Sequence, residues 1–118
     1  MGRVDRRTGA VYSCGVRPII YLCANDEPND DHEKQRLLKL FTSWGALVLD
    51  PELVTNHLEG VDKLDACQNL AFRCDAVFLA NGWRDSLKAQ MLVAACQRRL
   101  LPMLPTEEVA SKFLENWA

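Results

Sequence analysis

Short apolar runs alternate with segments of helical periodicity along most of this chain, and that alternation limits the fold more than any other feature. The runs are too short for buried helices and are mostly rich in residues that favour strands, whereas the segments between them repeat apolar residues every three or four positions. A repeated strand–helix order is typical of a parallel sheet with right-handed crossovers. The runs cover residues 19–24, 46–49, 76–80 and 100–104, and the helical segments cover about 32–44, 61–74, 87–99 and 106–117.

We therefore predict a three-layer α/β fold: a Rossmann-like or flavodoxin-like parallel sheet of four to five strands with helices on both faces. The chain has 118 residues, of which 48% are hydrophobic, enough for one compact core. Pro102 interrupts the last run and favours an edge position for that strand. Residues 1–16 are rich in charge and glycine. We predict that 1–16 form an N-terminal arm or an extra edge strand, and that 17–118 form the α/β domain.

Charge and cysteine content exclude several classes of protein. The chain has 14 basic and 16 acidic residues and a net charge of −2, so it lacks the basic field that nucleic acid binding requires. It has no run of about 18 apolar residues and no signal-peptide pattern, so we expect no membrane association. Five cysteines without metal-ligand spacing indicate reduced thiols in a cytoplasmic protein. We expect no cofactor and no metal, because the acidic segment 25–31 resembles a calcium loop only in composition.

The junction between the third run and the helix after it is the best candidate for a site. Ligands of open α/β sheets bind at the carboxyl ends of the strands, where helix N-termini offer unpaired N–H groups to polar or anionic groups. Asn81, Arg84, Asp85 and Ser86 lie at this junction, and Lys88 follows one turn into the helix. Either Asp85 or Ser86 alone also fits an ordinary helix cap. Lys88 either contributes positive charge to the site or pairs with Asp85.

Several motifs together resemble the nucleoside 2-deoxyribosyltransferase-like superfamily, in particular its small, poorly characterised bacterial and phage members. The resemblance covers roughly residues 18–105, and its most specific part is the Gly-Trp-x-x-Ser turn that begins at Gly82. It implies a Rossmann-like sheet, a homodimer or larger oligomer, and cleavage or exchange of the N-glycosidic bond of deoxynucleosides or deoxynucleotides through a glutamate nucleophile. The motifs are Ile20-Tyr21-Leu22-Cys23-Ala24-Asn25, Val48-Leu49-Asp50-Pro51, Cys74-Asp75-Ala76-Val77 and Gly82-Trp83-Arg84-Asp85-Ser86.

The departures from the family pattern concern its chemistry. Counting from Ser86 places Leu92 at the position of the nucleophilic glutamate, and Cys67 stands where an aspartate often assists the leaving base. The Gly-Pro that follows the family's first strand is replaced by Ala24-Asn25, which adds side-chain bulk. Covalent glycosyl transfer requires an activated carboxylate. We therefore expect a non-catalytic member of this superfamily.

Other residues fit a structural role as well as a functional one. Tyr21 matches a tyrosine of the family's active site, but a tyrosine in a buried strand is more often a core residue with a bonded hydroxyl. Asp50 and Asp75 lie at strand ends, where they either hold a ribose hydroxyl or cap the next turn. Trp83 either stacks on a nucleobase or fills an interface, and the sequence does not separate these two roles.

Three functions follow from these observations. The first is a non-catalytic module that binds a nucleotide-like small molecule or a protein partner, as a phage or regulatory accessory protein would. The second is an active N-glycosidase or deoxyribosyltransferase in which Asp85, Asp26 or Asp50 has taken over the carboxylate role. The third is a purely structural subunit that oligomerises through its last two helices. The predicted ligand contacts are those of Tyr21, Ala24, Asn25, Asp50, Asn81, Gly82, Trp83, Arg84, Asp85, Ser86 and Lys88.

Overall fold

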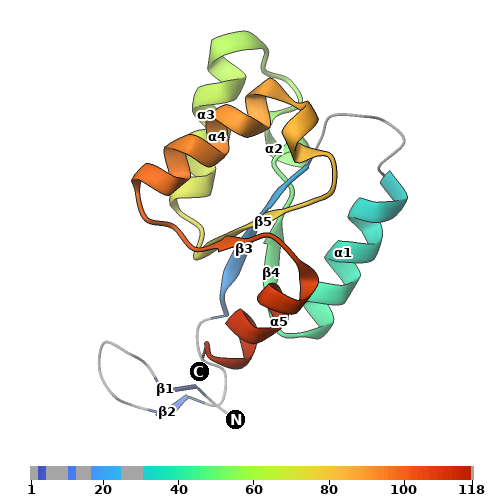
Figure 1. Ribbon diagram of the computed structural model, residues 1–118, viewed down its shortest axis with the longest axis vertical. Coiled ribbons are helices and arrows are strands. Elements are labelled where there is room, and N and C mark those ends of the chain that lie inside the picture. The colour runs from blue at the N-terminus through green and yellow to red at the C-terminus, as the bar shows by residue number, and fades with distance from the viewer. Residues whose placement is uncertain (1–2, 5–10, 13–16, 25–30, 118) are drawn as a thin grey trace.

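The computed structural model describes residues 3–4, 11–12, 17–24 and 31–117. After a small N-terminal sheet, strands and helices alternate regularly along the chain, as Figure 1 shows. In chain order the elements are β1 (Arg3–Val4), β2 (Val11–Tyr12), β3 (Ile19–Cys23), α1 (Asp31–Ser43), β4 (Leu47–Leu49), α2 (Glu52–Thr55), α3 (Gly60–Phe72), β5 (Ala76–Leu79), the single 3₁₀ turn η2 (Trp83–Asp85), α4 (Leu87–Arg98), β6 (Met103–Leu104) and α5 (Glu107–Glu115).

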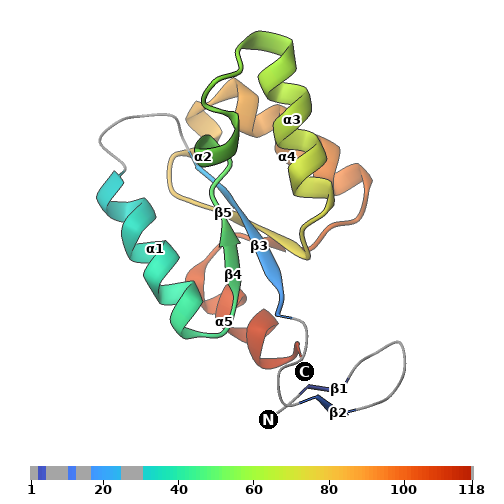
Figure 2. The ribbon, with the colours of Figure 1, turned by 180° about the vertical axis from the view of Figure 1, so that it is seen from behind.

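The main sheet has four parallel strands in the order β4-β3-β5-β6. The chain passes from β3 to β4 on one side and then returns across β3 to β5, so the strand order reverses between β3 and β5. In open α/β sheets such a reversal opens a crevice at the carboxyl ends of the strands, where ligands bind. Figure 2 shows β4 running toward α2, so this edge of the sheet is the one occupied by α2 and the start of α3. The predicted α/β fold class is confirmed.

Two hydrophobic cores cover the two faces of the sheet because successive side chains of a strand point to opposite faces. On one face Ile20, Leu22 and Phe78 pack against α1 and α5. On the other face Tyr21 and Val77, with their neighbours, pack against α3 and α4. Helices therefore lie on both faces, and α3 and α4 form the layer beside the crevice (Figure 1).

Helix ends follow from local sequence. The hydroxyl of Ser86 accepts a hydrogen bond from the N–H of Ala89 at the start of α4, and Thr106 makes the same bond to Val109 at the start of α5, each at 3.2 Å. Gly45 ends the turn after α1 with a φ of 96°, a left-handed conformation that residues with a side chain rarely adopt.

The structure differs from the sequence-based expectation in several details. Residues 52–55, expected as loop, form α2, and β6 is a two-residue edge strand. β1 and β2 pair with each other in a separate antiparallel sheet and do not extend the main one. Val61 and Val109 occupy apolar positions of their helical repeats but are 72% and 38% exposed. Helical spacing predicts a face but not how far the neighbouring layer extends over it.

Two further findings concern the cysteines and the helices. Within the described ranges Cys67, Cys74 and Cys96 are free thiols, as predicted, and Cys14 lies outside those ranges. No helix in the described part of the chain is both long and apolar enough to cross a membrane.

Candidate functional site

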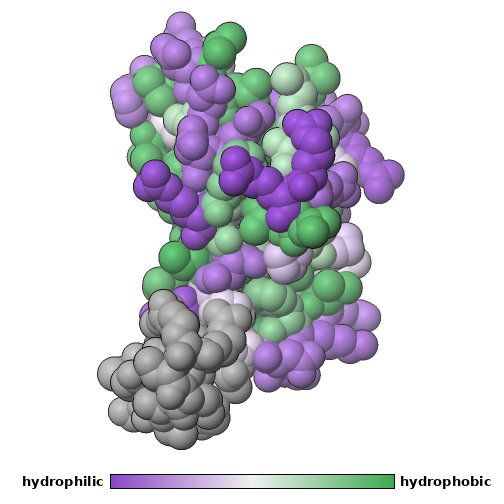
Figure 3. All heavy atoms as spheres, turned by 90° about the vertical axis from the view of Figure 1, so that its left-hand side faces the viewer, coloured by the Kyte–Doolittle hydropathy of each residue, from purple (hydrophilic) through white to green (hydrophobic). Residues whose placement is uncertain are grey.

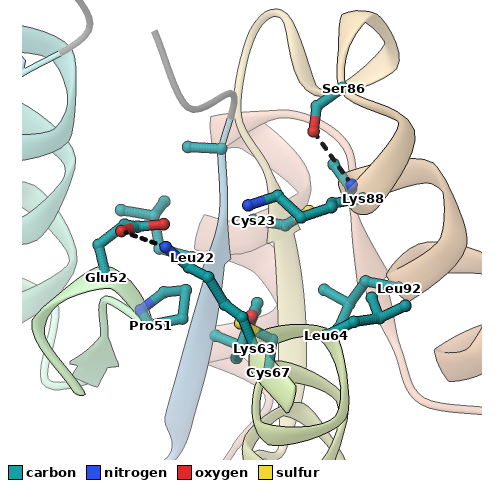
Figure 4. A pocket seen from close by; sticks show the side chains of 13 residues that line it. Leu22, Cys23, Pro51, Glu52, Lys63, Leu64, Cys67, Ser86, Lys88 and Leu92 are labelled. Atoms are coloured by element: carbon teal, nitrogen blue, oxygen red, sulfur yellow. Dashed lines mark hydrogen bonds and ion pairs between the residues drawn. The ribbon is translucent and has the colours of Figure 1, made fainter. Parts of the chain in front are cut away.

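A pocket opens at the carboxyl edge of the sheet, beside the point where the strand order reverses. Its walls come from the carboxyl end of β3 at residues 21–24 and from the segments after two other strands, namely Pro51 and Glu52 after β4 and α4 after β5. α3 closes the remaining side (Figure 4). The pocket has a volume of about 50 Å³. This is small beside the roughly 300 Å³ or more of typical small-molecule sites, so only one end of such a ligand fits inside.

Polar contacts connect Thr55 with two residues of the inner wall, Cys67 and Tyr21. Thr55, only 1% exposed, donates its hydroxyl proton to the carbonyl of Pro51 at 2.8 Å, and its oxygen lies 3.7 Å from Sγ of Cys67. Since Thr55 has a single hydroxyl proton, the Cys67 thiol is the donor in that contact. Cys67 in turn is bonded to the hydroxyl of Tyr21, which therefore donates to the sulfur.

The hydroxyl of Tyr21 is an interior group. Tyr21 is 2% exposed, and this burial, followed by the proximity of Cys67, raises its pKa well above the ordinary value. At neutral pH the hydroxyl is uncharged, and its proton is donated to Cys67 and not to a ligand. This arrangement supports the core interpretation of Tyr21, although its ring also forms part of the pocket wall.

The polar groups of the pocket gather at its mouth. Lys63 of α3 forms an ion pair with Glu52 of α2 at 3.0 Å, and the two side chains are 15% and 33% exposed. Lys88 reaches from α4 toward the end of β3, and Ser86 stands above it at the helix N-terminus (Figure 4). The first backbone N–H groups of α4 have no acceptor within the helix, and its dipole adds partial positive charge. Among the described residues that line the pocket there are thus two ammonium groups and one carboxylate.

The position that the family resemblance assigns to the nucleophile lies in this pocket but is apolar. Leu92 is 3% exposed and lines the pocket beside Ala89, and Leu64 of α3 lies next to it (Figure 4). Leu92 also belongs to the core between α3, α4 and the sheet. The deeper wall is thus apolar at this position, and among the described residues that line the pocket Glu52 is the one carboxylate.

The predicted site residues divide into two groups. Tyr21, Ala24, Ser86 and Lys88 line the pocket, whereas Trp83 and Arg84 line a second, shallow groove along the outer flank of α4. The left-handed turn at Gly82, with a φ of 86°, and the 3₁₀ turn after it direct these neighbours to different sides of the helix.

Two other predicted residues, Asn81 and Asp85, line neither wall. Both are exposed in the turn. Asn25 and Asp26 lie outside the described residues.

The two aspartates at strand ends have structural partners. Asp50 accepts the N–H of Glu52 at 3.1 Å and lies 3.8 Å from the ammonium of Lys34, so it caps α2. Asp75 accepts the N–H of Ile19 at 2.8 Å and thereby joins the start of β5 to the start of β3, at the opposite edge of the sheet from the pocket.

Sequence reasoning missed Glu52 and Lys63. Both lie in or beside a segment expected to be loop, and their pairing joins α2 to the next helix across eleven positions. A hint was available, because Lys63, Leu64 and Cys67 share one face of the predicted helix, and Cys67 stands where the family resemblance places an aspartate of the active site. Among the described residues no group of three or more His, Cys, Asp or Glu side chains is arranged to hold a metal ion.

Comparison of the chain with protein-family models, with curated proteins and with solved structures gives no match.

Proposed function

We propose that this protein is a non-catalytic member of the nucleoside 2-deoxyribosyltransferase-like superfamily that binds a nucleotide-like small molecule by an anionic end. The observation that carries the proposal is Leu92, a buried apolar residue in the pocket wall at the position that the family resemblance assigns to the nucleophile. A leucine has no group that attacks an anomeric carbon or takes up a proton. Binding remains available to this pocket, and glycosyl transfer through that position does not.

The mouth of the pocket supports an anionic end as the part that enters. Lys88, Lys63 and the N-terminus of α4 converge there, and a phosphate or carboxylate meets both ammonium groups and helix N–H donors. The small volume of the pocket places the rest of the ligand over the rim. We expect affinity to depend on the anionic group and to fall with added salt.

The test is a thermal-shift screen against nucleosides, deoxynucleoside monophosphates, cyclic nucleotides and ADP-ribose, with base release followed by chromatography. A ligand at about one hundred times its Kd stabilises the folded state by about 2.7 kcal/mol, a shift of several degrees in Tm for a domain of this size. We expect a shift with phosphorylated compounds and no base release. Lys88→Ala should abolish the shift, whereas Lys112→Ala, an exposed lysine of α5 on the other face of the sheet, should preserve it.

One observation favours a second candidate, an active N-glycosidase. Glu52 lines the pocket, so a relocated carboxylate would be Glu52 rather than the predicted Asp50, which caps α2, or Asp85, which lies outside the pocket wall. Covalent glycosyl transfer requires such a carboxylate, and Glu52 also forms the ion pair with Lys63 at 3.0 Å. Base release by the wild type that Glu52→Gln abolishes would establish this alternative and refute the non-catalytic proposal.

A further inference from the structure

The outward face of α4 has an unusual composition for a helix on the surface of a three-layer domain. Leu87 and Met91, one turn apart, are 71% and 45% exposed. No acidic residue occurs between Asp85 and Glu107, although the chain as a whole is acidic. We call the following exposed residues the α4 outer face: Leu87, Gln90, Met91, Ala94, Gln97 and Arg98.

A shallow groove runs along one flank of this face. Its volume is about 370 Å³, and it lies between η2 and the middle of α4. At one end the guanidinium of Arg84 lies 5.3 Å from the ring centre of Trp83, and Gln90 donates its amide to the carbonyl of Arg84, which fixes the turn against the helix. Val93, 3% exposed, and Ala94 form the apolar middle of the groove.

Among the described residues that line the groove Arg84 is the one charged residue, and Arg98 adds a second guanidinium on the α4 outer face. Within the described residues neither Arg84 nor Arg98 takes part in an ion pair. Arg99, at the end of the helix, lies over the ring of Phe72 at 3.9 Å. The groove and the α4 outer face thus combine an aromatic ring, apolar side chains and two guanidinium groups that form no ion pair within the described residues, a composition typical of protein interfaces.

We propose that the α4 outer face and its groove bind an acidic segment of a protein partner that carries an apolar anchor residue. The anchor occupies the apolar middle of the groove beside Trp83, and carboxylates of the segment pair with Arg84 and Arg98. This site lies on the opposite flank of α4 from the ligand pocket and does not depend on the function proposed for that pocket.

Charge complementarity selects this occupant over a second copy of the chain. A two-fold interface places the same patch on both sides. Two outer faces in contact would therefore bring arginines of both copies together with no carboxylate from either face. The homodimer expected from the family resemblance stays a prediction, and it would use another surface.

The test measures fluorescence anisotropy of a labelled synthetic peptide of alternating glutamate and leucine with serine spacers. Two matched peptides replace every glutamate by lysine or every leucine by serine. We expect saturable binding of the first peptide only, at least about tenfold weaker for the other two. Arg84→Glu combined with Arg98→Glu should weaken binding by a similar factor, whereas Lys39→Glu, an exposed charge reversal on α1 at the other face of the sheet, should change it less than about twofold.

A second pair of variants keeps the test informative if the charge reversals disturb folding, which circular dichroism reports. Leu87→Ser should weaken peptide binding, and Val109→Ser, an exposed valine of α5, should not. Equal binding of the lysine peptide, or an unchanged affinity in the arginine variant, would overturn the proposal. A concentration-dependent dimer that Met91→Glu dissociates would assign the face to a second copy of the chain. Binding to anionic phospholipid vesicles without peptide binding would assign it to a membrane surface. Either result would overturn the proposal.

Discussion

The ionisation of the Tyr21 hydroxyl tests whether water reaches the inner wall of the pocket. Tyr21 is 2% exposed and donates to Cys67, and burial raises its pKa above the ordinary value of 10.0. In the unfolded chain the hydroxyl ionises near pH 10, whereas in the folded protein it keeps its proton. The unfolded state is therefore favoured as pH rises above about 10, and this contribution to stability is fully present below that value.

The magnitude follows from linkage. Above pH 10 the free energy of unfolding falls by about 1.4 kcal/mol per pH unit for one such group, so Tyr21 accounts for a loss of about 1.4 kcal/mol by pH 11. Tyr21→Phe loses a single hydrogen bond, a cost of about 1 kcal/mol at pH 8, but it removes the pH dependence. The wild type should be the more stable protein at pH 8, and the variant should equal or exceed it between about pH 10 and 11.

The assay is urea denaturation of both proteins at pH 8, 9.5 and 11, because all other titrating groups are shared and cancel in the difference. Absorbance of tyrosinate gives a direct check, since the chain has only two tyrosines. In the wild type one tyrosine should ionise only on unfolding, and that late phase should be missing in the variant. A constant difference in stability from pH 8 to 11, or ionisation of Tyr21 near pH 10 in the folded protein, would show that the hydroxyl is open to the pocket and would refute the core interpretation.

Three further predictions follow from individual contacts. Ser86→Ala and Thr106→Ala remove equivalent helix caps, so denaturation should show that each lowers the free energy of unfolding by about 1 kcal/mol. Thermal-shift titrations should show that only Ser86→Ala also weakens ligand binding. Burial raises the pKa of Cys74 to about 12 and that of Cys96 to about 11, so at pH 8 both thiols should react with Ellman's reagent only at the rate of unfolding. Fast reaction of either thiol would contradict its burial. Arg36 pairs with Glu33 of its own helix α1 and with Glu107 of α5 but is 47% exposed, so Arg36→Ala should lower the free energy of unfolding by no more than about 1 kcal/mol, a loss that high salt should mask.

Much of the fold is predictable from sequence because its determinants are local. Apolar runs, caps such as Thr106 and the turn at Gly45 identify the elements, and the alternation of strand and helix determines the topology. The edge position of β6 follows from Pro102. Exposure is less predictable, since Val61 occupies an apolar helical position but lies beyond the reach of the neighbouring layer.

The site is only partly predictable because its geometry depends on non-local contacts. Sequence reasoning placed a site after β5, and Ser86 and Lys88 do line the pocket. The pairing of Glu52 with Lys63 joins two helices whose separation only the folded chain determines. The surroundings of Tyr21 likewise include Cys67, a residue of α3 that is distant in sequence from β3.

α4 connects the two proposed sites, and its geometry keeps them apart. Successive residues of an α-helix turn by about 100°, so Gln90 points about 200° away from Leu92 around the helix axis. Leu92 accordingly lines the pocket, and Gln90 lines the groove on the other flank. Substitutions at Lys88 should therefore affect the small-molecule ligand without affecting an acidic peptide, and substitutions at Arg84 should do the reverse. Coupled losses in both assays would instead indicate that the variants disturb the N-terminal turn of α4 as a unit, and neither assay could then be read as a report on a single site.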